Sequence, residues 1–231
     1  MSSRKNSLKR KSFFALLLVF FPAIILILVG SRSCDHKFKE LDDYGKIKPY
    51  SFIDVNGKKN SDQDFKNTIV IFTVLQESCP FDCSLSFWPL ERHIYQQIRK
   101  NRKKLNQVRL ISFVVDKDGK PVKDLSNMEN ILKDNVLKYD ANLWILASGD
   151  PKSIYDIKHN NINLLETGKN SHKKNSYQDL ILLVDKKSHL RMALNGNAKD
   201  PESEGMIRRM KQSLGLLLKQ YDKEKHSEGK K

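Results

Sequence analysis

The sequence is short of cysteine and of long apolar segments. Three cysteines in 231 residues are too few for a small fold held together by disulfides. Residues 13–30 form a single uncharged apolar run of membrane length, which excludes a transporter with several spans. No Gly-X-Y period, sustained heptad pattern or repeat is present, so collagen-like, coiled-coil and repeat architectures are also excluded. Several short apolar runs remain, and they predict one folded domain of ordinary size.

The apolar run at 13–30 predicts a membrane anchor. As a helix it would rise about 27 Å, close to the roughly 30 Å of a bilayer's hydrocarbon core. Residues 1–12 contain five basic and no acidic residues, so the positive-inside rule places them in the cytoplasm. A cleaved signal peptide would have a shorter apolar core, and Arg32 is unsuitable just before a lipid-modified Cys34. We expect one uncleaved span in the inner membrane, with residues 31–231 on the periplasmic side.

Basic residues exceed acidic ones, 42 against 27, for a formal net charge of +15. They gather at 99–104 and again between 219 and 231. No aromatic residues alternate with them at 99–104, and no zinc-finger or helix-turn-helix signature is present. These clusters are interpreted as solvated surfaces, and no nucleic-acid partner is expected.

Strands and helices alternate along the outer part of the chain. A hairpin is predicted after residues 50–55, at Asn56-Gly57. The predicted strands are 68–75, 108–115, 143–147, 179–185 and 189–194. The predicted helices are 84–105, one that Ser126 caps together with Glu129, a short one after Asp150, and 202–221. This order predicts an α/β protein with the thioredoxin-like fold, an N-terminal β-hairpin and one preceding transmembrane helix.

The predicted organisation has five parts. They are a basic cytoplasmic flank (1–12), a transmembrane anchor (13–30), a stalk (31–46), a thioredoxin-like domain (47–221) and a basic tail (222–231). Residues 160–176 within the domain are polar and predict a loop.

Cys79 and Cys83 stand between a predicted buried strand and a predicted helix. Their four-residue spacing puts both thiols on one face of a helical turn, and a helix N-terminus favours the thiolate form. Such a pair can form a disulfide or hold a soft ion such as Cu(I). Structural or incidental cysteines are the alternative. Cys34 lies in the predicted stalk and is interpreted as spare or modified.

In this arrangement the sequence resembles the SCO/SenC family of membrane-anchored, thioredoxin-like proteins that serve cytochrome c oxidase assembly. The resemblance covers residues 46–221, after the single span. Its pieces are IVIFTVL running into CPFDC, SFVVDKD with Asp116, LWILASGD with Trp144 and Gly149, and LLVDKKSHLRMALNG with Asp185 and Gly196.

The resemblance implies that Cys79 and Cys83 bind copper, as Cu(I) or also Cu(II), and that they can form a disulfide. It also implies a histidine ligand eight residues before Asp185, but Tyr177 stands there. A phenol is a poor Cu(I) ligand beside two thiolates. His172, five residues earlier on the same polar loop, is the substitute ligand that the sequence offers; the alternative is a solvated loop residue.

Two smaller departures are Ser84 and Lys117, which replace prolines of the family pattern. Three functions remain open. The first is a metallochaperone that delivers Cu(I) to a respiratory oxidase subunit or another copper or thiol protein, or reduces its thiols. The second is an extracytoplasmic thiol–disulfide oxidoreductase or redox sensor without stable copper binding. The third is a binding module that has lost the metal.

Overall fold

The computed structural model describes residues 20–22, 25, 41–81, 85–159, 162–166 and 176–228. The chain divides into two compact units, Met1–Lys39 and Glu40–Lys231. Residues 20–22 and 25 of the first unit are helical, and the rest of the predicted anchor lies outside the described residues. None of the helices in the described part of the chain combines the length and the apolar composition that a membrane crossing needs. The anchor therefore stays a prediction.

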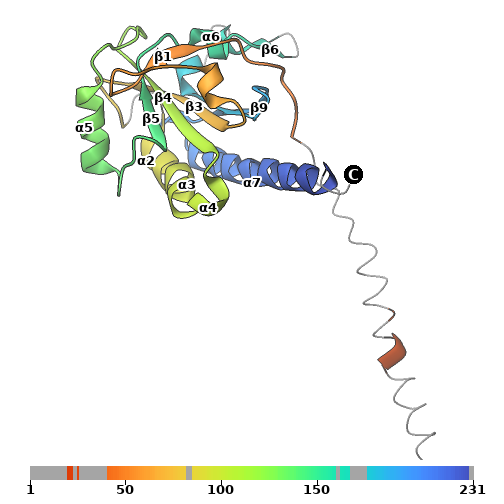
Figure 1. The fold of residues 1–231 in the computed structure, drawn as a ribbon. Helices are drawn as coiled ribbons and strands as arrows, with labels where there is room; N and C mark the ends of the chain where they lie inside the picture. The colour runs from red at the N-terminus through yellow and green to blue at the C-terminus, as the bar shows by residue number, and fades with distance from the viewer. Residues whose placement is uncertain are drawn as a thin grey trace, which may run out of the picture. The chain divides into compact units, whose positions relative to one another are not determined.

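A mixed five-stranded sheet forms the centre of the second unit (Figure 1). Its order is β5-β4-β3-β8-β9, with β3, β4 and β5 parallel and β8 antiparallel to both of its neighbours. The strands are β3 (Ile69–Gln76), β4 (Val108–Val115), β5 (Trp144–Ala147), β8 (Leu180–Val184) and β9 (Leu190–Asn195). The apolar runs therefore predicted each strand to within one or two residues.

Both faces of the sheet are covered, and this is why its central strands are mostly apolar on both faces. Ile69, Ile71 and Leu75 of β3 enter one core, whereas Val70 and Phe72 enter the other. This alternation follows from the two-residue period of a strand.

The first core is closed mainly by a long helical segment after β3 and by the C-terminal helix, which lie below the sheet in Figure 1. The segment consists of α2 (Phe87–Leu90), a π-helical turn η2 (Glu91–Tyr95), α3 (Gln96–Lys100) and α4 (Arg102–Leu105). The C-terminal helix is α7 (Ser203–Glu228), and α5 (Ser126–Asn135) also contributes to this core.

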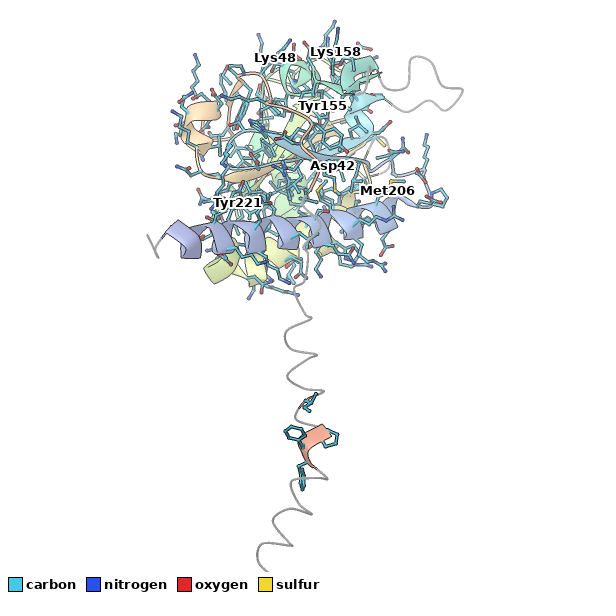
Figure 2. The ribbon with its side chains drawn as sticks, turned by 90° about the vertical axis from the view of Figure 1, so that its right-hand side faces the viewer. Asp42, Lys48, Tyr155, Lys158, Met206 and Tyr221 are labelled. Carbon is cyan, nitrogen blue, oxygen red and sulfur yellow. The ribbon has the colours of Figure 1, made fainter. Side chains whose placement is uncertain are left out.

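The second core is covered by the hairpin β1 (Ser51–Ile53) and β2 (Lys59–Ser61) and by α6 (Lys152–Tyr155). Tyr155 and Lys158 lie on the side of the sheet opposite α7 (Figure 2). Helices on both faces of a sheet that ends in an antiparallel hairpin, with a terminal helix and an N-terminal hairpin, form the predicted thioredoxin-like fold.

Two local predictions were wrong. The helix predicted at 84–105 begins at Phe87 and is broken by the π-helical turn. Ser126 does not cap α5; instead Asp124 Oδ1 accepts the Ser126 N–H at 3.0 Å. The N-cap residue is Leu125, whose carbonyl accepts the Glu129 N–H at 2.9 Å, and the Asp124 carboxylate forms a turn just before the helix.

The polar loop predicted at 160–176 contains short regular elements in its described residues. These are β7 (Ile162–Asn163), paired with β6 (Lys158–His159), and the 3₁₀ turn η3 (Leu164–Glu166). At the N-terminal end of the unit, the Tyr44 N–H donates to Leu190 O and the Ile47 N–H to Ser188 O, both at 2.9 Å. Residues 41–46, predicted as the end of the stalk, therefore contact β9 and the turn before it.

Candidate thiol site

Cys79 lies just beyond the carboxyl end of β3, where reactive groups gather in parallel sheets. The Cys79 N–H donates to Gln76 O at 3.2 Å and closes a tight turn. The Glu77 N–H donates to Val115 O at 2.9 Å, which ties this turn to the end of β4. Cys79 is half-buried, and the ends of two central strands hold the backbone of its turn.

Cys79 is disulfide-bonded. Cys34 and Cys83, the other cysteines of the chain, lie outside the described residues, as does His172. The predicted metal site of Cys79, Cys83 and His172 therefore stays a prediction. In the described part of the chain, no three His, Cys, Asp or Glu side chains are grouped so that they would hold a metal ion.

Aromatic rings pack next to the cysteine turn. The Phe81 ring stacks on Trp88, with ring centres 5.5 Å apart and 4° between the planes, and meets Phe87 edge-on at 5.0 Å. Phe87 is fully buried, whereas Trp88 is 45% exposed. Phe81, which stands between the two cysteines in the sequence, thus contacts one buried and one exposed aromatic ring beside Cys79.

The chain that follows the cysteine turn is held by the end of β9. The Ser86 N–H donates to Gly196 O at 2.7 Å, and Leu85 forms a β-bridge with Asn197. A Cβ on Gly196 would lie 2.7 Å from the side chains of both Leu85 and Ile181. A side chain at position 196 would therefore have to displace the ends of these two buried side chains.

Tyr177 lies at the same edge of the sheet as Cys79. It begins η4 (Tyr177–Asp179), which leads into β8, and Leu182 of β8 pairs with Phe72 of β3. This antiparallel register places η4 beside the carboxyl end of β3. The sequence position that the family pattern gives to histidine is thus near the thiol.

The Tyr177 side chain is engaged by the core rather than free to bind a metal. Its ring packs at 5.3 Å from the ring of Tyr155, which is fully buried. Burial raises the pKa of the Tyr177 phenol, so the group stays protonated and is a poor anionic ligand. The Tyr177 ring is thus part of the packing around the second core, and its role toward a metal stays a prediction.

The turn after β4 completes this edge. Asp116 Oδ1 accepts the N–H groups of Asp118 at 2.8 Å and Lys120 at 2.9 Å. These backbone hydrogen bonds hold the pKa of Asp116 below its usual range, and the bond from Lys120 has the largest effect. A Cβ on Gly119 would meet Gln178 Nε2 at 2.6 Å, so this turn lies directly against η4. The Asp116 carboxylate thus stabilises the turn that borders this edge of the sheet.

A buried polar network supports the edge from below. The Trp144 Nε1–H donates to Ser112 Oγ at 2.8 Å, and Ser112 Oγ shares a 2.6 Å hydrogen bond with Thr73 Oγ1. All three residues are fully buried in the sheet. Because an unpaired polar group in this core would cost about 1–3 kcal/mol, the network favours one register of β3, β4 and β5.

The remaining histidines that the structure describes in detail have other roles. His93 Nε2 lies 3.1 Å from Glu204 Oε1 and links η2 to α7. His189 Nδ1 lies 2.8 Å from Asp43 Oδ2.

No family profile and no curated protein matches the chain. Solved structures do. BsSco, a member of the Sco family of cytochrome c oxidase assembly proteins with a disulfide switch, is 20% identical over 77% of this chain and 97% of its own, with a TM-score of 0.47. ScoI of Bradyrhizobium japonicum with copper bound is 21% identical over 73% and 98%, with a TM-score of 0.42. A thiol peroxidase from Chromobacterium violaceum is 12% identical over 75% and 87%, with a TM-score of 0.43.

The structural neighbours thus include Sco proteins, the family that the sequence motifs resemble, at low sequence identity. The fold assignment itself rests on the strand order and helix placement of this chain. Sequence reasoning missed the Phe81–Trp88 stack and the link from Ser86 to Gly196, because contacts between distant segments have no local pattern. The aromatic residue inside CPFDC was the available signal.

Proposed function

We propose that this protein is a Sco-type dithiol protein of the extracytoplasmic side of the membrane, in which Cys79 and Cys83 alternate between a disulfide and a Cu(I)-binding dithiol. The observation that carries this proposal is the half-buried, disulfide-bonded Cys79 at the carboxyl end of β3. The four-residue spacing makes Cys83 its proposed partner. The proposed target is the copper site of a respiratory oxidase subunit or of another copper or thiol protein.

The redox step needs a dithiol protein as reductant. One thiolate of that protein attacks the disulfide, its second thiol releases the mixed disulfide, and the partner becomes oxidised. Two electrons and two protons reach Cys79 and Cys83. Cu(I) is the cargo of the reduced pair: two thiolates bind it, and their two protons pass to water.

A second function, thiol–disulfide exchange without stable copper binding, is favoured by one observation. Tyr177 packs on Tyr155 and its phenol keeps its proton. A two-thiolate site without a third ligand would hold Cu(I) less tightly. In this case the reduced pair would reduce a disulfide of its target to two thiols, would itself become a disulfide, and would not deliver the metal.

Anaerobic Cu(I) titration of the full-length protein in detergent, against a competing chelator, tests the proposal. The reduced protein should take up one Cu(I), and the oxidised protein none. If the oxidised protein exchanges its disulfide with a dithiol partner but the reduced protein does not compete for copper, the second function is correct. If Cys79 neither exchanges nor binds copper, both are wrong.

A further inference from the structure

A cavity of about 690 Å³ lies at the end of β3 opposite Cys79. Three segments line it: 46–49 before β1, residues 62–67 before β3, and the β8–β9 turn at 186–188. Val70 near the start of β3 pairs with Val184 at the end of β8, so the second and third segments meet here. The eight residues of β3 separate this cavity from the thiol edge by roughly 26 Å.

The cavity is strongly cationic. Among the described residues that line it, Asp62 is the only acid, and its carboxylate accepts the Gln63 amide at 2.9 Å. Five lysines line it, and we call this site the lysine pocket: Lys46, Lys48, Lys66, Lys186 and Lys187. Like charges held together in a concave site raise the local concentration of anions.

Two of these lysines already have partners. Lys48 forms an ion pair with Asp156, and Lys186 Nζ lies 4.6 Å from the centre of the Tyr221 ring. Figure 2 labels Lys48 and Tyr221. In the described part of the chain, no carboxylate lies within ion-pair distance of Lys46, Lys66 or Lys187. Among the described residues, these three charges are thus the ones that a bound anion could neutralise.

The backbone around the pocket is also unusual. Asn67 has a φ of 61° and Ser188 a φ of 65°, and both residues line the pocket. This left-handed conformation is unfavourable for residues that carry a Cβ, and it persists where the surrounding structure requires it. The two turns stand directly beside Lys66 and Lys187, and their amide and hydroxyl groups add neutral hydrogen-bond donors to the pocket.

We propose that the lysine pocket binds a phosphate group, either of an anionic phospholipid or free in solution. Lysine is a common point-charge ligand of phosphate in proteins. Lys46 and Ile47 line the pocket, and Lys46 follows the end of the predicted anchor by sixteen positions, roughly 55 Å when fully extended. Lipid headgroups are therefore within reach. This proposal does not depend on copper or on the cysteines.

The test is calorimetric titration of the full-length protein in a neutral detergent at low ionic strength. Two probes separate the sources: inorganic phosphate, and dihexanoyl phosphatidylglycerol compared with dihexanoyl phosphatidylcholine. The pocket variant replaces Lys46, Lys66 and Lys187 by Gln. The matched control replaces the exposed Lys59, Lys123 and Lys211 by Gln and removes the same net charge.

We expect the pocket variant to bind at least tenfold more weakly than the control variant. Binding of both anionic probes supports a general phosphate site, and binding of phosphatidylglycerol alone supports a headgroup site. Equal losses in the two variants would show a general effect of charge and would overturn the proposal. So would the absence of binding to either anionic probe in the parent protein.

Discussion

At its carboxyl end, β3 leads into Cys79, where backbone hydrogen bonds to Gln76 and Val115, packed rings and a disulfide hold the chain. At its amino end, β3 follows Lys66 and Asn67, where exposed lysines surround a cavity. Packing and hydrogen bonds hold the carboxyl end of β3, whereas positive charge is the main feature of its amino end. Substitutions at the thiol edge should therefore act through geometry and be insensitive to salt. Those at the lysine pocket should leave stability almost unchanged and depend on ionic strength.

The largest effect is expected from Cys79→Ser. One thiolate cannot replace two, so Cu(I) affinity should fall by about a thousandfold, or about 4 kcal/mol, and the disulfide should be lost. Competition titration and thiol counting measure the two losses. Phosphate binding at the lysine pocket should not change. Cys34→Ser is the matched control, and a Cys79→Ser protein that binds copper like its parent would contradict the proposed function.

Gly149→Ala should destabilise the fold at the thiol edge. The new Cβ would lie 2.9 Å from Ser51 O and 3.1 Å from Phe52 Cβ, so backbone must move. We expect a loss of roughly 1–3 kcal/mol in the free energy of unfolding, measured with urea and near-UV circular dichroism. Gly205→Ala, on α7 with open space around it, should instead stabilise by up to about 1 kcal/mol. Equal effects would argue against the close approach.

Tyr177→His tests whether the thiol edge has lost a ligand. An imidazole at this position should tighten Cu(I) binding by about tenfold, or about 1.4 kcal/mol, because it supplies a third donor next to the thiols. Tyr177→Phe keeps the ring packed on Tyr155 and should leave the affinity unchanged. If the histidine variant binds no better than the phenylalanine variant, residue 177 is not in reach of the metal.

The stack of Phe81 on Trp88 should couple the cysteine turn to α2. A double-mutant cycle with alanine at both positions should give an interaction of about 0.5–1.5 kcal/mol in the free energy of unfolding. Phe81→Ala combined with Leu137→Ala, a distant and exposed position, should be additive. Additivity in both pairs would mean that the stack does not hold the turn.

The smallest effect concerns Asp43, near the lysine pocket. Hydrogen bonds lower the pKa of its carboxyl; the one from the Gly45 N–H has the largest effect, and the one with His189 is next. The carboxylate is therefore favoured in the folded state. Its contribution to stability is complete above the unfolded-state pKa near 3.9 and is lost as the pH falls through the lower folded value. Asp43→Asn should flatten the acid side of a stability-against-pH curve, measured by urea midpoints. Asp42→Asn, exposed and adjacent, should leave the curve unchanged.

Patterns along the chain predicted the sheet and the place of Cys79, because buried parallel strands are continuous apolar runs such as those at 69–76 and 108–115. The predicted cap of α5 was wrong because the helix begins at Ser126 itself, and Asp124 Oδ1 accepts both the N–H and the hydroxyl of that residue. The lysine pocket was also invisible, because its residues come from three segments that only the fold brings together.

The π-helical turn at Glu91–Tyr95 makes this segment sensitive to the insertion or deletion of a residue. Phe87 and Tyr95 both contact the Trp144 ring, at 5.5 and 5.4 Å between ring centres. In a regular α-helix, two residues eight positions apart point about 80° away from each other. The additional residue of a π-helical turn brings them to the same side. Deleting one residue here would leave the composition almost intact and yet withdraw one of the two rings from Trp144, so insertions and deletions should be tolerated less well than substitutions in this segment.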